Sequence, residues 1–137
     1  SEKSLAVTKP NKIILRYDKS FCIVSNDKSL VYIPDIDKWG KWDQDIFKVV
    51  LHTDYALLDG TFYSSNEIPH RQISEIPHPF IVETMELFEN MNTKNRKKIF
   101  FIHFNHSNPA IAYSSSVSSL IRSRRFNVAK EGLKFTL

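Results

Sequence analysis

The sequence has 137 residues, with 19 Lys or Arg against 15 Asp or Glu, and 42% of its residues are hydrophobic. This length suits one domain, and the composition is that of a globular chain rather than a disordered one. Three glycines are too few for a Gly-rich phosphate-binding loop, and a single cysteine excludes an intramolecular disulfide and a cysteine-rich zinc site.

The charge and the hydropathy pattern favour a cytoplasmic protein. No apolar run reaches the ~18 residues of a membrane span, and residues 1–10 lack the apolar stretch of a signal peptide. The net charge is +4, and the basic residues are dispersed except for clusters at 95–98 and 122–125. Solvated helix ends account for both clusters, so we expect neither a membrane nor a nucleic acid as partner.

The first third of the chain predicts strands and one helix. Residues 1–11 are polar and Lys-rich, and we expect them to be loosely held. A strand at 13–16 precedes a hairpin, because β-branched runs at 21–25 and 30–33 flank a turn-forming Asn-Asp-Lys-Ser sequence. Apolar residues at helical spacing then predict a helix at 42–51.

The middle of the chain alternates strand and helix. An apolar strand at 55–58 ends at Asp59, and a loop with three prolines follows at 62–79. Apolar spacing predicts a helix at 80–91. The continuous apolar run at 99–102 is typical of a strand covered on both faces.

The last part predicts a helix capped by the serines at 114–116 and two closing strands, at 126–129 and 133–137. Strands and helices therefore alternate along most of the chain. This order predicts an α/β fold, α+β in some classifications, with a mixed sheet and about three helices on its faces.

Polar residues follow three of the apolar strands. Asp35, Asp59 and His103 each come shortly after one, and His106 lies nearby. Strand ends lie side by side in α/β folds, so these residues can converge, and carboxylates with imidazoles suit zinc, manganese or iron. Each also has an ordinary interpretation, as a turn carboxylate or a partly buried histidine. A hydrolytic metal site is therefore one of two interpretations.

Three motifs resemble the metallo-β-lactamase-fold hydrolases: Tyr-Ile-Pro-Asp at 32–35, Leu-Leu-Asp-Gly-Thr-Phe-Tyr at 57–63 and Phe-Ile-His-Phe-Asn-His-Ser-Asn-Pro at 101–109. Their order resembles the C-terminal half of that fold. Within the superfamily they are most similar to the B proteins of pyrroloquinoline quinone biosynthesis and to phosphodiesterase-like members. The resemblance implies half of an αββα sandwich, whose complete form holds two divalent ions, zinc or else manganese or iron, at one edge.

The resemblance also implies roles for single residues. Asp35 matches the metal-bridging carboxylate and His103 the late histidine ligand, while Asp59 matches an acidic residue that orients a ligand histidine. His78 matches a histidine that protonates a leaving oxygen. His106 stands where the quinone-biosynthesis pattern has asparagine, so it is an additional metal ligand or a substrate contact.

The defining His-x-His-x-Asp-His motif of the superfamily is absent from the sequence. The resemblance thus implies that residues 1–137 form a single domain, the C-terminal half of the fold without its N-terminal half. A fragment is favoured, and a split protein or a half that forms a homodimer are the alternatives. We expect a metal-dependent hydrolase of phosphodiesters or other small-molecule esters, inactive alone. The alternatives are a role in quinone-cofactor biosynthesis and a non-catalytic interaction module.

Overall fold

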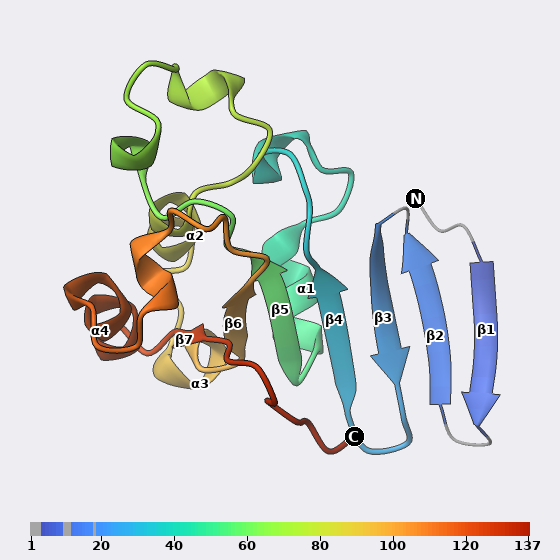
Figure 1. Ribbon diagram of the computed structural model, residues 1–137. Coiled ribbons are helices and arrows are strands. Elements are labelled where there is room, and N and C mark those ends of the chain that lie inside the picture. Colours follow the sequence, from blue (N-terminus) through green and yellow to red (C-terminus); the bar gives the residue numbers. More distant parts are fainter. Residues whose placement is uncertain (1–3, 10–11, 18) are drawn as a thin grey trace.

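The computed structural model describes residues 4–9, 12–17 and 19–137, with side chains described from residue 19 onward. The described residues form one seven-stranded sheet in which the strands follow chain order from β1 to β7 (Figure 1). Strands β1 to β4 are antiparallel, and β4 to β7 are parallel. The predicted mixed sheet is confirmed.

The antiparallel part is a meander of four strands: β1 (Ser4–Lys9), β2 (Lys12–Tyr17), β3 (Ser20–Val24) and β4 (Ser29–Ile33). The predicted hairpin is β3 with β4, and the strand predicted at 13–16 is β2.

Residues 4–9 form β1, a strand that was not predicted, while the expectation that residues 1–11 are loosely held stays a prediction. Their Leu-Ala-Val-Thr run suits a strand and pairs with β2. Residues 1–3 and 10–11 of that segment lie outside the described residues.

The parallel part continues with β5 (Tyr55–Asp59), β6 (Ile99–Ile102) and β7 (Asn127–Val128). The helices between the parallel strands are α1 (Ile46–His52), α2 (Ile81–Leu87), α3 (Thr93–Arg96) and α4 (Ser116–Ser123). Short 3-10 turns lie at Trp39–Lys41, Ser65–Glu67, Ile73–Glu75 and Pro109–Ile111. Among the described residues, no helix has the length and apolar character to cross a bilayer.

Three helix predictions need correction. Helix α1 begins at Ile46 rather than at 42, because the Asp45 side chain caps it by accepting from the Phe47 N–H at 3.0 Å. Helix α2 ends at Leu87, short of the predicted residue 91. The described chain has four α-helices instead of about three, because the Asn92 side chain caps the additional turn α3.

One face of the sheet packs against the helices. Alternate residues of β4, β5 and β6 are buried there, as a strand's period of two requires. They contact buried apolar residues of α1, α2 and α4, and each fully buried side chain contributes about 1.5–3 kcal/mol. The buried sheet residues are Val31, Ile33, Ala56, Leu58, Ile99 and Phe101.

The opposite face carries half-buried side chains, among them the register neighbours Leu57 and Phe100. The Phe135 ring lies on this face, with its centroid 4.7 Å from that of Tyr55 and 5.1 Å from that of Phe100. Residues 133–137 are thus a C-terminal segment that crosses the sheet (Figure 1), and the prediction of a strand there is wrong. Strand β6 is fully buried on one face only.

Candidate metal centre

The parallel register brings the ends of three strands to one edge of the sheet. Ile33 of β4 pairs with Leu58 of β5, and Asp59 pairs with Ile102 of β6. Residues that directly follow these strands therefore lie close together. Asp35 follows β4, Asp59 ends β5 and His103 follows β6, so the convergence inferred from the sequence is present for these three.

Asp59 is the buried anchor of this cluster, with no exposed surface. Its Oδ1 accepts from the Thr61 N–H at 2.8 Å and from the Thr61 hydroxyl at 2.7 Å. Its Oδ2 accepts from the Ile36 N–H at 3.2 Å and lies 2.7 Å from the His78 Nδ1. Both oxygens of Asp59 therefore have protein partners, and its role as a residue that orients a ligand histidine stays a prediction.

His78 lies between two prolines in the long loop before α2. Its Nδ1 faces Asp59 and also lies 3.7 Å from the Asp35 Oδ1. Because Nδ1 is engaged by the carboxylate, Nε2 is the ring nitrogen left for another partner. The side chain is 18% exposed.

The backbone of His78 is held by a lysine that sequence reasoning missed. The Lys38 ammonium donates to the His78 carbonyl at 2.8 Å and to the Glu83 carboxylate at 2.7 Å. Glu83 in turn accepts from the Phe80 N–H at 2.9 Å, and the ammonium lies 4.4 Å from the centre of the Phe80 ring. Lys38 therefore ties the loop that carries the histidine to the start of α2.

Asp35 is the most accessible carboxylate of the cluster, with 34% of its side chain exposed. Its Oδ2 accepts from the Lys19 ammonium at 2.8 Å. This hydrogen bond lowers the pKa of Asp35 below its usual value; partial burial opposes the shift, and the charges of Lys19, His78 and His103 add to it. Asp35 is therefore ionised near neutral pH, as a metal ligand must be.

His103 is held in an unusual backbone conformation, with φ of 63°. Its Nδ1 lies 3.1 Å from the Thr61 hydroxyl, and its ring centroid is 6.4 Å from that of His78. Because the Thr61 hydroxyl donates to Asp59, it accepts from the His103 Nδ1–H, which leaves Nε2 of His103 free. A left-handed conformation costs about 1–3 kcal/mol in a residue other than glycine and occurs often at functional sites.

Two further residues lock the motifs of β5 and β6 together. A Cβ on Gly60 would lie 3.0 Å from the Ile102 carbonyl oxygen, so only glycine allows this approach. The buried Asn108 amide donates to the carbonyl of Gly60 at 2.7 Å and to that of Thr61 at 3.2 Å. Both residues belong to the motifs that carry the resemblance, yet their contacts were not predicted.

The donor set suits zinc but does not complete its coordination. One ligand atom from each of Asp35, Asp59 and His78 lies within 4.8 Å of the others. Carboxylate oxygen and imidazole nitrogen are zinc ligands, and zinc takes three or four protein ligands. Since both oxygens of Asp59, the Oδ2 of Asp35 and the Nδ1 atoms of both histidines have protein partners, the donors left are the Asp35 Oδ1 and the Nε2 atoms of His78 and His103. His106 is exposed in the turn after β6 and lies outside the three-residue group, so its role stays a prediction.

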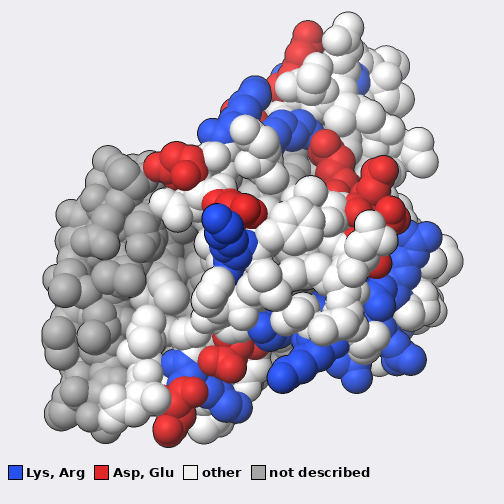
Figure 2. Space-filling model, turned by 180° about the vertical axis from the view of Figure 1, so that it is seen from behind, with Lys and Arg blue, Asp and Glu red and all other residues white. Residues whose placement is uncertain are grey.

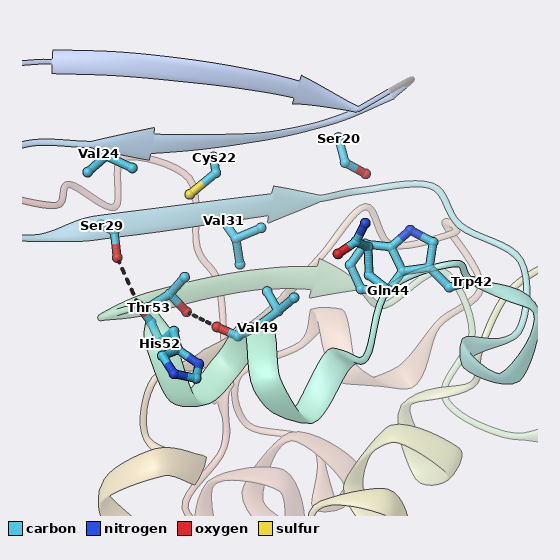
Figure 3. A pocket seen from close by; sticks show the side chains of 10 residues that line it. All are labelled: Ser20, Cys22, Val24, Ser29, Val31, Trp42, Gln44, Val49, His52 and Thr53. Atoms are coloured by element: carbon cyan, nitrogen blue, oxygen red, sulfur yellow. Dashed lines mark hydrogen bonds between the residues drawn. The ribbon is translucent and has the colours of Figure 1, made fainter. Parts of the chain in front are cut away.

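A cavity of about 310 Å³ lies on the helix side of the sheet, between β3, β4 and α1. Figure 3 shows the side chains of Cys22, Val31, Trp42 and Val49 around it. Burial raises the pKa of the Cys22 thiol, which disfavours the reactive thiolate form. None of the candidate metal ligands lines this cavity, so the two features are separate.

The comparisons with known proteins identify the fold as that of a metallo-β-lactamase-fold protein. The crystal structure of Zn²⁺-bound PqqB from Methylobacterium extorquens matches with a TM-score of 0.71 and 20% identity, over 98% of this chain and 50% of that one. No protein-family model matches the chain.

The sequence comparison gives the same protein type. Coenzyme PQQ synthesis protein B from two strains of Acinetobacter baumannii, ACICU and AYE, is 24% identical to this chain over 115 residues, 80% of this chain and 37% of those proteins. The chain therefore spans little more than a third of the length of these curated relatives. The resemblance stated from the sequence motifs is confirmed.

Proposed function

We propose that this chain forms one side of the metal site of a metallo-β-lactamase-fold hydrolase, acting on phosphodiesters or other small esters. The observation that carries the proposal is the cluster of donor atoms from Asp35 after β4, Asp59 at the end of β5 and His78 in the loop before α2. The zinc named for the PqqB structure supports zinc as the metal. That the complete site holds two ions is part of the proposal.

In this proposal Asp35 and His103 hold zinc, and His106 is a further ligand or contacts the substrate. Bound zinc supplies Lewis acidity, which polarises an ester oxygen and lowers the pKa of water. Asp59 stabilises the protonated imidazole of His78, whose Nε2 donates a proton to the leaving oxygen. Thr61 keeps the Nδ1–H of His103 turned inward, so that the ligand nitrogen faces out.

The chain needs a partner polypeptide to finish this site. Asp35, His103 and at most His106 leave each of two ions short of protein ligands, and the relatives are two to three times longer than the segment they share with this chain. We propose that the partner corresponds to the remaining, N-terminal half of the fold, and that it covers the half-buried sheet face near Leu57 and Phe100. A second copy of the chain is the alternative partner.

A role in the synthesis of the quinone cofactor PQQ is the second candidate function. The observation that favours it is the similarity to PqqB in both sequence and fold. The two candidates differ in substrate, and both use the same residues. Loss of PQQ production on deletion of the gene, with no ester hydrolysis by the purified protein, would favour this second function.

Zinc affinity and hydrolysis test the first proposal. Both are measured in the longest native polypeptide that contains residues 1–137, by chelator competition and with an activated phosphodiester. Asp35→Ala and His103→Ala should each weaken zinc binding at least 10-fold and abolish hydrolysis, whereas the matched control Asp37→Ala, at an exposed carboxylate, should change neither. Unchanged zinc binding in the first two variants contradicts the proposal.

A further inference from the structure

The positive charge of the chain is concentrated in its last third. Residues 92–137 contain nine Lys or Arg and one Asp or Glu, a net charge of +8, whereas residues 1–91 contain ten basic and fourteen acidic residues, a net charge of −4. The overall charge of +4 conceals this division. A surface of high local charge is a physical basis for binding an oppositely charged partner.

The topology brings the two basic sequence clusters to one edge of the sheet. Strands β6 and β7 are parallel neighbours, with Phe100 opposite Asn127. Neighbouring strands are about 4.8 Å apart, so the residues just before these two strands lie side by side. The Asn127 side chain confirms the contact, because it donates to the Lys97 carbonyl at 2.8 Å.

We call the surface made by Lys94, Lys97, Arg124 and Arg125 the basic edge; it lies where β6 and β7 begin, at the end of the sheet opposite the candidate metal centre. All four side chains are exposed. Figure 2 shows Lys and Arg side chains gathered toward the lower right of the back face, where α3 and α4 lie.

The charges of the basic edge have no acidic partner among the described residues. In contrast, Lys19, Lys38 and Lys41 in the first part of the chain each form an ion pair with a carboxylate. Lys98 is not part of the edge, because its ammonium caps the end of α1. The basic edge thus presents cations that no described carboxylate neutralises.

Arg125, in the basic edge, has a left-handed backbone conformation that residues other than glycine disfavour. Its φ is 71°, and its N–H donates to the Arg122 carbonyl while the Phe126 N–H donates to the Ile121 carbonyl. This is the arrangement that ends many helices, and its left-handed position is usually glycine. An arginine there costs about 1 kcal/mol or more, so the turn itself does not account for the choice of residue.

We propose that the basic edge binds the phosphate backbone of a nucleic acid. From the sequence, each cluster was explained separately as a solvated helix end, whereas the pairing of β6 with β7 places the two clusters side by side. Hydroxyl groups accompany the cations, since Ser119 and Ser123 in the last part of α4 are exposed and suit phosphate contacts. A membrane surface is less well supported, because α4 exposes one large apolar residue, Leu120, where interfacial helices expose several.

Fluorescence anisotropy with a labelled DNA duplex and a labelled single-stranded RNA, each of about 20 nucleotides per strand, tests this proposal. We expect binding that weakens steeply with salt. The triple variant Lys97→Ala, Arg124→Ala, Arg125→Ala should bind at least 10-fold more weakly and reduce the slope of log affinity against log salt by about 2–3. Whichever probe binds more tightly identifies the kind of nucleic acid.

The control variant Lys41→Ala, Lys48→Ala, Arg71→Ala removes the same charge from other exposed positions. Its affinity for the nucleic acid should be within about 2-fold of that of the unmodified chain. This change is smaller than the loss of affinity expected when one phosphate contact is removed. Equal losses in both variants would overturn the proposal, because net charge alone would then explain binding. So would binding to phosphatidylserine vesicles without binding to either nucleic acid. If the triple variant has a lower thermal midpoint, Lys94→Ala with Lys97→Ala replaces it, with the same expected direction.

Discussion

The Nδ1 of His78 lies 2.7 Å from the Oδ2 of Asp59, a carboxylate with no exposed surface. The pair joins two segments 19 residues apart, and the same carboxylate accepts hydrogen bonds from Thr61 and from the backbone beside Asp35. One buried anion thus orients a histidine, a hydroxyl and a loop. The candidate centre depends on this arrangement.

Replacing Asp59 with asparagine tests the anchor. The Asn amide would turn an N–H toward donors that now face an oxygen, and leaving buried donors unsatisfied costs about 1–3 kcal/mol each. We therefore expect the free energy of unfolding in urea to fall by at least about 1 kcal/mol. Asp37→Asn, at an exposed carboxylate, is the control and should change it little. Equal stability of the two variants would show that the Asp59 contacts are unimportant.

Thr61 offers a conservative pair of substitutions. Thr61→Val removes the hydroxyl that links Asp59 to His103 and should weaken zinc binding about 10–100-fold, the range seen when a group that orients a ligand is lost. Thr61→Ser keeps the hydroxyl and should bind zinc nearly as well as the unmodified chain. The measurement is chelator competition, and equal affinities of the Val and Ser variants contradict the prediction.

His103→Gly should lower zinc affinity without lowering the stability of the fold. Glycine adopts positive φ without strain, so the variant should unfold at equal or higher urea concentration, with a gain of up to about 1 kcal/mol. Zinc affinity should fall at the same time. His106→Gly is the matched control, because that residue lacks a positive φ and should lose stability. A clear loss of stability in His103→Gly would mean that other contacts of this histidine dominate.

Gly60→Ala should destabilise the fold. The added Cβ would lie 3.0 Å from the Ile102 carbonyl oxygen and from two side-chain carbons, and such crowding in a packed region costs about 1–3 kcal/mol. Gly40→Ala is the control, since nothing lies within 4 Å of its added Cβ. Thermal unfolding of both variants measures the difference, and a midpoint for Gly60→Ala equal to the control's would refute it.

The raised pKa of Glu67 should make the free energy of unfolding depend on pH. Burial raises the pKa of Glu67, and the hydrogen bonds from Ser64 and Tyr63 to its carboxylate oppose the shift only in part. Because the folded-state pKa lies above the unfolded value, the stabilising contribution of Glu67 is complete at low pH and is lost as the pH rises through the folded-state pKa. Glu67→Gln should therefore gain stability relative to the unmodified chain between about pH 4 and pH 7. A constant difference across that range contradicts the assignment.

The elements that sequence reasoning located well have a strong local signal. Strands β5 and β6 are short apolar runs, and the polar residues directly after them, Asp59 and His103, occupy the same edge of the sheet. The start of α1 was missed because Trp42 continues the apolar spacing toward the N-terminus. The Asp45 side chain caps the helix, so that it begins at Ile46. Tertiary context likewise decides residues 133–137, where Phe135 packs on the sheet face without strand pairing.

The supporting contacts of the site were not predictable, because they join distant positions. Lys19 and Asp35 are 16 residues apart, Lys38 and His78 are 40 apart, and Thr61 and His103 are 42 apart. A lysine or threonine in a single sequence carries no sign of such a partner. The basic edge was hidden for the same reason, since its two clusters become neighbours only through the pairing of β6 with β7.

An anomalous-scattering map recorded at the zinc absorption edge, from crystals grown with zinc, tests directly whether Asp35 and His103 bind a common metal ion. We expect a peak at the carboxyl ends of β4 and β6, with ligand atoms of Asp35 and His103 about 2.0–2.2 Å from it. A zinc position elsewhere, such as on the exposed His52 or His70, with none beside Asp35, would contradict the account.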